Sequence, residues 1–508
     1  MHLEKIAGST GLYTAPANPV LAALQSRLPA HLQALGRGLL ERDTATRLLL
    51  LAALAGEHVL LIGPPGTAKS ELARRLHRAF AGARYFERLL TRFSTPEELF
   101  GPLSLKALED DRYERLIDGY LPTAGIAFLD EVFKANSAIL NALLTLLNER
   151  EFDNGTVRLH TPLISVVGAS NEPPADDSLL AFHDRFLLRV PVAPVGDAAF
   201  AALLLLDDPA PAGPATNPAT RLAAAEASPP PAAPAAPPAP ISATERAAAL
   251  AARAGVALGD EALAALAALR AEAARQGLTV SDRRWRQLVA LMRCAAATEG
   301  RATLDALDLW LAPYVLAAEA EAVPRLAGWV TQALVQAEPQ PLTWLDHAVT
   351  AFDKQLDLEQ RLPAEGTDSE GHDNSAGKLA LARSLGADDA GQGMARILAT
   401  TLEAQQRRRF SPVHIAARLA QVDAIAARAE AARAQVQAAH DALAARLVPR
   451  LWLPPALAES WLAAHRQTLT TLAGLQARLA TTRAGFAAHP VEAAMPAVVP
   501  APVALGAA

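Results

Sequence analysis

The first candidate for chemistry in this sequence of 508 residues is a phosphate-binding loop. The stretch LLIGPPGTAKSELARRL, residues 60–76, runs from an apolar segment through two glycines and two prolines into a basic helical pattern. In the motif G-x-x-x-x-G-K-[ST], backbone N–H groups cradle phosphates, the lysine reaches the β/γ-phosphates and the hydroxyl faces Mg²⁺. The residues of this loop are Gly63, Pro64, Pro65, Gly66, Thr67, Ala68, Lys69 and Ser70.

Ala68 departs from the usual pattern, which has a small, flexible glycine there. Gly63 and Gly66 remain at the positions where the backbone turns tightly around phosphates. A methyl group at position 68 is tolerable if the residue keeps a helical φ at the start of the helix. On this condition we expect the loop to bind nucleotide, rather than to be a glycine turn without function.

A second acidic element strengthens that expectation. The segment IAFLDEVFKAN is an apolar strand pattern that ends in Asp130 and Glu131, at the carboxyl end of a strand where the loop also lies. An Asp there holds Mg²⁺, and an adjacent Glu polarises the attacking water in phosphoryl transfer. The sequence therefore predicts an ATP site with Ser70 and Asp130 as the side chains near Mg²⁺.

An α/β layered domain is expected around these residues, because strand-like runs alternate with helical patterns over residues 20–206. Two hairpin signals interrupt the alternation, one near Asp110-Asp111 and one at Asn154-Gly155. The expected strands are 58–62, 85–90, 125–129, 163–168 and 186–191. The expected divisions are a nucleotide-binding core (1–206), a Pro/Ala-rich linker (207–241), an all-α lid (242–325), a helical domain (326–490) and a flexible tail (491–508).

The helical domain is expected to contain a long antiparallel hairpin. Ile415, Val422, Ala429, Val436 and Leu443 repeat every seven residues, and a second helix with the same spacing follows VPRLWLPP. Two alternatives remain open for this hairpin: a stalk that packs on itself or on a third helix, and an arm that binds a partner.

Composition limits the classes of function. The formal net charge of -6 gives no general reason to expect nucleic acid as the main partner. The single cysteine, Cys294, fits a reducing compartment and is expected to be an inert core thiol. Neither a signal-peptide pattern nor an apolar run of about 20 residues is present, so we expect no integral membrane segment and a cytoplasmic location.

Several ordered motifs together resemble the MoxR family of AAA+ ATPases, and most closely its RavA-type subgroup (regulatory ATPase variant A). They are GPPGTAKS, TRFSTPEELFGPLS, GYLPTAGIAFLDEVFKAN, LLNEREFDNG and ASNEPP with FHDRFLLRV. The resemblance extends strongly over residues 20–206 and less strongly over 242–320. It implies an AAA+ P-loop domain with a parallel sheet, an all-α lid and a hexameric ring with ATP and Mg²⁺ between subunits.

The resemblance also implies three further site residues. Asn171 matches sensor 1, which positions the attacking water. Arg185 matches the arginine finger, which acts on the γ-phosphate of the neighbouring subunit; its alternatives are Arg189 or a plain salt bridge of Arg185 with Asp184. Arg283, in VSDRRW behind the cap residue Ser281, matches sensor 2, with the adjacent Arg284 as its alternative.

Three weaker expectations follow from the family pattern. The segment GLLERD, residues 38–43, resembles the lining of the adenine pocket. The two hairpins resemble the helix-2 and pre-sensor-1 insertions, so Arg112, Tyr113 and Arg115 either contact a client or are ordinary exposed residues. The β-rich module of the RavA type has no counterpart at 336–400, where we expect a reduced, helical insertion.

Two classes of function follow. The first is an ATP-hydrolysing chaperone or remodelling machine that works with a von Willebrand factor A-domain partner on protein clients. The alternative is a nucleotide-gated scaffold in which slow hydrolysis only times assembly. A DNA-translocating motor is a weaker third idea, since no basic stripe for nucleic acid is evident.

Overall fold

The computed structural model describes residues 18–172, 179–206, 237–335, 342–361 and 409–504, and these fall into two compact units. Unit 1 consists of residues 1–337 with residues 447–458, and unit 2 of residues 338–446 with residues 459–508. The nucleotide-binding core and the lid thus form one unit. The expected linker lies outside the described residues over 207–236.

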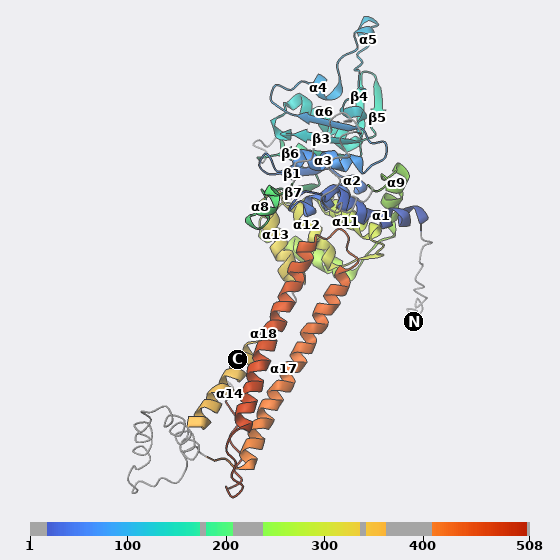
Figure 1. Ribbon diagram of the computed structural model, residues 1–508. Helices are drawn as coiled ribbons and strands as arrows, with labels where there is room; N and C mark the ends of the chain where they lie inside the picture. Colours follow the sequence, from blue (N-terminus) through green and yellow to red (C-terminus); the bar gives the residue numbers. More distant parts are fainter. Residues whose placement is uncertain (1–17, 173–178, 207–236, 336–341, 362–408, 505–508) are drawn as a thin grey trace, which may run out of the picture. The chain divides into compact units, whose positions relative to one another are not determined.

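A five-stranded parallel sheet is the centre of unit 1 (Figure 1). Its order is β2-β3-β6-β1-β7, and each expected strand overlaps one observed strand. The strands are β1 (Val59–Ile62), β2 (Tyr85–Leu89), β3 (Ile126–Asp130), β6 (Ser165–Ser170) and β7 (Leu188–Pro191). The three middle strands are almost entirely buried, as expected for parallel strands covered by helices on both faces.

The helices of the core present their apolar faces to this sheet. On one side, Ile139, Leu143 and Leu146 of α6 share a cluster with Ala127 and Leu129 of β3. Asn136 caps α6 by accepting a hydrogen bond from the backbone N–H of Ile139. The core helices are α1 (Pro19–Gly36), α2 (Asp43–Ala55), α3 (Lys69–Arg78), α6 (Ser137–Glu149), α7 (Leu180–His183) and α8 (Asp197–Leu204).

One of the two expected hairpins is present in full, and the other only as an antiparallel bridge across its turn. Strands β4 (Glu151–Asn154) and β5 (Val157–His160) pair antiparallel, and Gly155 takes the positive φ that the turn needs. The expected turn near Asp110-Asp111 is present, and Leu103 and Arg115 form an antiparallel bridge across it, but α5 (Leu105–Glu109), which follows α4 (Pro96–Phe100), stands in place of a regular strand. Ser104 caps α5, which allows the short helix to compete with an extended strand.

The two insertions are joined to each other. The Asn154 side chain accepts a hydrogen bond from the Arg115 N–H (2.7 Å) and donates one to the Arg115 carbonyl (3.1 Å). Tyr113 is 55% exposed, and Arg112 pairs with Asp110 and Glu114 at the surface. These contacts are compatible with both interpretations of Arg112, Tyr113 and Arg115, as residues that contact a client and as ordinary exposed residues.

The lid begins with α9 (Ala243–Ala252), which starts in a capping box formed by Ser242 and Glu245. Two short strands, β8 (Ala257–Leu258) and β9 (Thr303–Leu304), pair in parallel and join two segments of the lid that are distant in the sequence. Its remaining α-helices are α10 (Asp260–Arg275), α11 (Asp282–Thr298), α12 (Ala312–Leu316) and α13 (Ala322–Val330). Cys294 on α11 is fully buried, and burial raises the pKa of its thiol to about 12, as expected for an inert core residue.

Arg284 joins the lid to the core within unit 1. Its guanidinium is buried, donates to the carbonyl oxygens of Phe186 (3.0 Å) and Leu187 (2.8 Å), and pairs with Asp184 (2.8 Å). It also donates to the carbonyl oxygen of Val315. One side chain therefore fixes α11 to the segment that enters β7.

Unit 2 is a three-helix arrangement of α14 (Thr343–Arg361), α17 (Pro412–Leu447) and α18 (Pro455–Ala487) (Figure 1). The expected heptad residues Val422 and Ala429 are buried with Val349 of α14 and Leu472 of α18. The long hairpin is confirmed, and a third helix packs on it. Of the reduced, helical insertion expected at 336–400, the structure describes residues 342–361, which contain α14, and the rest lies outside the described residues.

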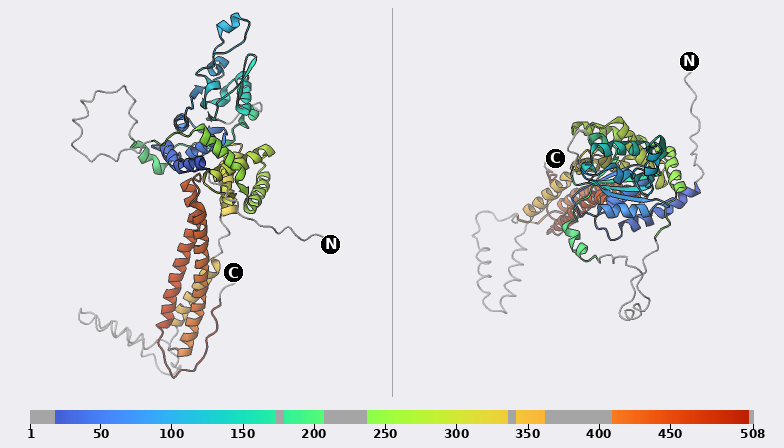
Figure 2. Two further views of the ribbon diagram at one scale, coloured as in Figure 1. Left: turned by 90° about the vertical axis from the view of Figure 1, so that its right-hand side faces the viewer. Right: turned by 90° about the horizontal axis from the view of Figure 1, so that it is seen from above.

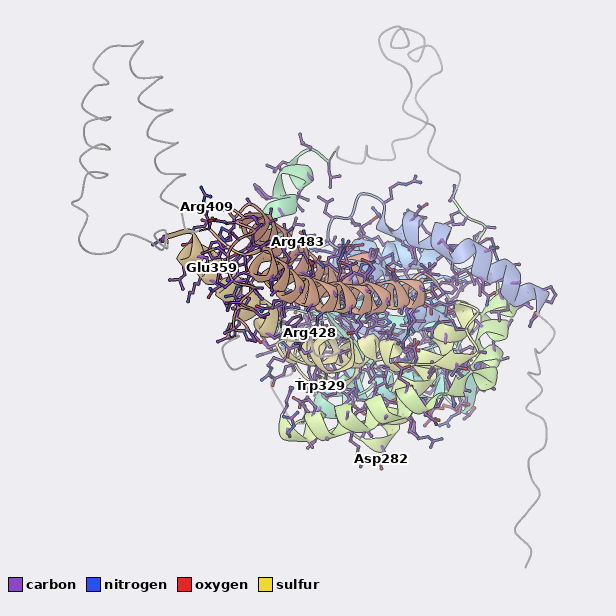
Figure 3. All side chains as sticks on the ribbon, turned by 90° about the horizontal axis from the view of Figure 1, so that it is seen from below. Asp282, Trp329, Glu359, Arg409, Arg428 and Arg483 are labelled. Carbon is purple, nitrogen blue, oxygen red and sulfur yellow. The ribbon has the colours of Figure 1, made fainter. Side chains whose placement is uncertain are left out.

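Glu359 is the polar centre of unit 2 and is labelled in Figure 3. Its buried carboxylate accepts from Arg418 Nε (2.9 Å) and faces the Nε2 atoms of His414 (3.3 Å) and His489 (3.5 Å). Burial raises the pKa of Glu359, but hydrogen bonds from His489 and Gln355 and the charge of Arg418 outweigh it and lower the pKa to about 2. The carboxylate thus ties α14 to α17 and to the segment after α18.

Two chain segments differ from the expected divisions. Residues 447–458, expected within the helical domain, belong to unit 1, where Arg450 pairs with Asp308 (2.7 Å) and Trp452 donates to Thr298 Oγ1 (2.8 Å). The tail is not free over its described residues, because Ala501 accepts a hydrogen bond from Arg418 of unit 2 (2.7 Å). None of the helices in the described ranges has both the length and the apolarity required to cross a bilayer.

Replacing Arg284 by methionine is expected to lower the free energy of unfolding by about 3 kcal/mol, because buried carbonyl oxygens then lose their donor. Arg283→Met, one residue earlier and exposed, is expected to change it by about 0.5 kcal/mol or less. Urea titrations of both full-length variants, followed by tryptophan fluorescence, measure the difference. Equal unfolding midpoints would show that Arg284 is not the tie between lid and core.

Candidate nucleotide site

Three strands end together at the proposed site. Strand β6 pairs in parallel with β1, where Ile62 lies beside Ser170, and with β3, where Leu129 lies beside Gly168. The carboxyl ends of these strands therefore lie on one edge of the sheet. The phosphate-binding loop, Asp130 and Asn171 all follow directly from that edge.

The loop has the backbone geometry of a phosphate cradle. Gly63 is enclosed so tightly that a Cβ there would lie 2.1 Å from the carbonyl oxygen of Val192, and Gly66 has φ +80°. Helix α3 starts at Lys69, and no side chain of its N-cap residue bonds the first N–H groups. Those N–H groups and the helix dipole are free to act on an anion.

The backbone of Ala68 does not meet the condition, a helical φ, under which its methyl group was expected to be tolerable. Its φ is +66° and its ψ is 24°, which is the left-handed region and not the helical one. For an L-residue this region costs about 1–2 kcal/mol, which is why glycine is usual at such a position. The loop is therefore locally strained at the residue before the lysine.

Lys69 is held inside the loop. Its Nζ donates to the carbonyl oxygens of Gly63 (2.7 Å) and Pro64 (2.8 Å), and its side chain is largely buried. Burial lowers the pKa of Lys69, while the charges of Asp130 and Glu131 raise it. The ammonium group is thus held by the loop carbonyls, within electrostatic range of the two acids at the strand edge but without a direct ion pair to either.

The two acids differ in environment. Asp130 ends β3, its Oδ1 accepts the N–H of Glu131 (3.0 Å), and burial raises its pKa. Burial makes the charged form of a carboxylate less favourable, and a bound cation offsets that free-energy cost. Asp130 and the hydroxyl of Ser70 are oxygen donors of the kind Mg²⁺ prefers, so these residues fit that ion.

Glu131 also has a strained backbone, with φ +50° and ψ 44°. Its carboxylate is 20% exposed and lies 3.3 Å from the Nζ of Lys134. Left-handed conformations of ordinary residues cost about 1–3 kcal/mol and concentrate at functional sites. The conformation turns the chain directly after Asp130 and starts the short helical turn Val132–Lys134.

The other candidate site residues, Asn171 and the arginines near β7, lie at different places in the fold. Asn171 is exposed directly after β6, on the same edge as Lys69. Arg185 lies before β7 and has a buried Nε without a hydrogen-bond partner in the described chain. Its alternative Arg189 is buried, donates to the carbonyl oxygen of Ala317 (2.8 Å), and has a pKa lowered by burial to about 9.

The two arginines of VSDRRW are also separated by the structure. Ser281 caps α11 as expected, Arg283 is exposed, and Arg284 forms the tie between lid and core described above. Arg283 has no hydrogen bond or ion pair with another described residue. The Arg283 guanidinium is therefore available to a ligand, whereas the Arg284 guanidinium is already hydrogen-bonded within unit 1.

Sequence reasoning missed Arg42 as an individual residue of the site. Within GLLERD, the buried Arg42 donates from Nε to the carbonyl oxygen of Thr67 (3.1 Å) and from Nη2 to that of Ala193 (2.7 Å). Thr67 in turn donates its hydroxyl to the carbonyl oxygen of Pro64 (3.0 Å). Arg42 thus supports the loop from behind, and because it stands between Glu41 and Asp43 no signal in the sequence distinguished it from a solvated charge.

Replacing Ala68 by glycine is expected to stabilise the protein by about 1 kcal/mol, because it removes the left-handed strain. Ala73→Gly, in the buried middle of α3, is the matched control and is expected to lose at least about 1 kcal/mol. Thermal unfolding of both variants measures the signs. Destabilisation by Ala68→Gly would contradict the strained loop.

Two segments of the chain match profiles of known protein domains. Residues 26–215 match the profile described as "MoxR domain in the MoxR-vWA-beta-propeller ternary systems", and residues 261–330 match the "AAA lid domain". A solved structure, a putative ATPase from Cytophaga hutchinsonii, superimposes with a TM-score of 0.45 at 15% identity, over 62% of this chain and 96% of that chain.

Curated relatives match over a shorter length. An uncharacterized protein of Methanocaldococcus jannaschii, MJ0079, is 57% identical over 151 residues, which is 30% of this chain and 40% of that protein. Protein MoxR of Paracoccus denitrificans is 31% identical over 153 residues, 29% of this chain and 44% of that protein. The chain thus spans less than half the length of these relatives. The two profile matches follow one another along the chain, so this chain is similar over two successive segments to a MoxR domain and to an AAA lid domain.

Proposed function

We propose that this chain binds ATP with Mg²⁺ at the edge of the parallel sheet and hydrolyses it. The observation that carries the proposal is that the loop with Lys69, after β1, and the acids Asp130 and Glu131, at the end of β3, share one edge of the sheet and interact electrostatically. A cationic loop at a helix N-terminus on the same edge as two acids matches what phosphoryl transfer requires. A fold similarity alone would not justify this conclusion.

In the proposed reaction, Lys69 exchanges its bonds to the Gly63 and Pro64 carbonyls for phosphate oxygens. Ser70 and Asp130 hold Mg²⁺, which supplies charge neutralisation at the phosphates when it is bound. Glu131 orients and polarises the attacking water, with Asn171 beside it on the same edge. Arg283 is the residue of the lid that reaches the γ-phosphate.

Arg185 is proposed to act on the nucleotide of a neighbouring subunit. Because β7 runs parallel to β1, a residue before β7 lies at the amino edge of the sheet, whereas the loop after β1 lies at the carboxyl edge. Four strand residues at about 3.3 Å each separate these edges, so Arg185 is remote from the loop of its own chain. A half-buried guanidinium without an ion-pair partner among the described residues supports a role toward a second molecule.

A ring of subunits follows from this arrangement, and we propose a hexamer. The description of the matching MoxR profile names vWA and β-propeller components. We therefore propose a partner with a von Willebrand factor A domain, and a chaperone or remodelling role toward protein clients. The VSDRRW motif and the helical unit 2 favour the RavA-type arrangement within the family.

A mixing experiment tests the catalytic assignment. Arg185→Ala retains Lys69 and Glu131, and Glu131→Gln retains Arg185, so each variant is expected to hydrolyse ATP at least 10³-fold more slowly than wild type, a factor of about the size that an arginine finger contributes. Mixed assemblies contain interfaces where an intact Glu131 meets an intact Arg185. A phosphate-release assay of the mixture is expected to recover part of the wild-type activity.

Arg361→Ala, which removes an exposed arginine of unit 2, is the matched control and should hydrolyse like wild type. Normal activity of Arg185→Ala, or no recovery in mixtures that share assemblies, would exclude the finger. Unchanged activity of Glu131→Gln would remove Glu131 from the mechanism. Assembly with ATP bound but no turnover in the wild type would favour the scaffold.

A further inference from the structure

Helix α10 of the lid has two apolar faces, and only one of them is buried. The buried face contains Ala262 and Leu269, both fully enclosed. Leu263, Leu266 and Ala267, at the spacing i, i+3 and i+4, form a second apolar stripe, in which Leu263 is 56% exposed. A helix that only holds its own domain together needs one apolar face. The second stripe of α10 is therefore free for a further contact.

Helix α11 is built in the same way. Arg284 and Leu288 belong to its buried face, which Arg284 joins to the core. Arg286, Val289 and Arg293, at the spacing i, i+3 and i+7, form another face of the helix. The left view of Figure 2 shows the yellow-green lid helices at the right-hand edge of unit 1. Between the second faces of α10 and α11 and the end of α9 lies a cavity of about 780 Å³, which we call the lid groove.

The lid groove combines apolar side chains, such as Leu266 and Trp285, with positive charge. Its four arginines are Arg253, Arg270, Arg286 and Arg293, and no acid is among the described residues that line it. None of the four forms an ion pair with an acid in the described part of the chain. The Nε of Arg293 is buried and has no hydrogen-bond partner among those residues. The lid groove therefore has a positive charge that its own chain does not neutralise.

The exposure of the lining residues indicates what kind of ligand fits. Leu263, Ala267, Arg270 and Arg286 are all exposed, so the lid groove is open along one side. Pockets for small molecules enclose about 70–90% of the ligand surface, whereas an amphipathic helix lays only one face into a groove. From Leu263 to Arg270, α10 advances about 10 Å, at about 1.5 Å per residue. This length is sufficient to contact about two turns of a second helix.

We propose that the lid groove binds an acidic, amphipathic helix of a partner protein. Apolar side chains of the partner helix at i, i+3, i+4 and i+7 pack on Leu263, Leu266 and Val289. Its Asp and Glu side chains, on both flanks of that stripe, pair with the arginines of the lid groove, because opposite charges across an interface select the partner. The proposal concerns docking and does not depend on ATP hydrolysis.

A synthetic peptide serves as the probe for the full-length chain. It is a fluorescein-labelled helix of about 16 residues with leucines at i, i+3, i+4 and i+7 and glutamates on both flanks of the leucines. Fluorescence anisotropy is expected to show saturable binding to the wild type. A peptide with the same leucines and with lysines in place of the glutamates is expected to bind at least about tenfold more weakly. Equal affinity of the two peptides, or no binding of the glutamate peptide, would overturn the proposal.

Two neighbouring substitutions on α10 locate the contact. Ala267→Glu places a carboxylate in the lining of the lid groove and is expected to lower the affinity for the glutamate peptide at least about tenfold. Ala268→Glu, the matched control, makes the same change at an exposed residue outside the lining and is expected to bind within about twofold of wild type. Both positions are exposed, so both variants are expected to fold, which circular dichroism checks. Equal affinity of the two variants would place the peptide elsewhere and overturn the proposal.

Reversing one charge of the lid groove tests the role of its arginines. Arg286→Glu is expected to weaken binding of the glutamate peptide about tenfold and to strengthen binding of the lysine peptide. Arg325→Glu, at an exposed arginine of α13 outside the lining, changes the net charge equally and is expected to leave both affinities within about twofold. If Arg286→Glu and Arg325→Glu had the same effect, the attraction would come from overall charge, and the proposed pairing would be wrong.

Two further measurements distinguish other occupants of the lid groove. Decanoate, a small amphiphilic anion, is expected to displace the peptide only at concentrations far above those of unlabelled peptide. Displacement by decanoate at lower concentrations than the peptide would assign the groove to a small molecule. Light scattering without peptide is expected to give the same molar mass for the wild type and Ala267→Glu. A lower mass for Ala267→Glu would assign the groove to a second copy of the chain, and either of these results would overturn the proposal.

Discussion

The parallel pairing of β6 with both β1 and β3 is the contact on which the site depends. It places the loop that leaves β1 and the acids that end β3 on one edge, with Asn171 between them at the end of β6. Side chains alternate between faces along a strand, so a shift of one residue in either pairing would turn Asp130 away from the loop. The packed core around Ala127, Leu129 and Val166 opposes that shift, because these residues would move to the opposite face of the sheet and lose their contacts with α6.

Strain and support are concentrated at the same edge. Ala68 and Glu131 both have positive φ, and each conformation costs free energy that the surrounding contacts must offset. Arg42 holds the carbonyl of Thr67, and Lys69 closes the loop on the Gly63 and Pro64 carbonyls. The loop thus has a defined shape before any phosphate binds, which lowers the ordering cost of binding.

The sequence predicted the parts of this architecture that depend on local pattern. Apolar runs located all five strands, the heptad spacing located the long hairpin, and strand-end acids located the site. It could not predict the φ of Ala68, since that angle is set by tertiary contacts of the loop. It also could not separate Arg283 from Arg284, because only the folded chain shows which of two adjacent guanidiniums reaches the carbonyls before β7. The sequence located the turn at Asp110-Asp111, but it did not reveal that Ser104 caps a short helix where a strand was expected to lead into that turn.

The central claim is that the sheet edge is a nucleotide site in which Lys69 exchanges backbone carbonyls for phosphates. Isothermal titration calorimetry of the full-length chain with a non-hydrolysable ATP analogue and Mg²⁺ tests it most directly, using Lys69→Ala and, as control, the exposed lysine variant Lys354→Ala. The account predicts saturable binding to wild type and Lys354→Ala, and binding at least about 100-fold weaker to Lys69→Ala, in line with a charge-assisted contact worth about 3 kcal/mol. Equal affinity of all three proteins, or no binding to the wild type, would contradict it.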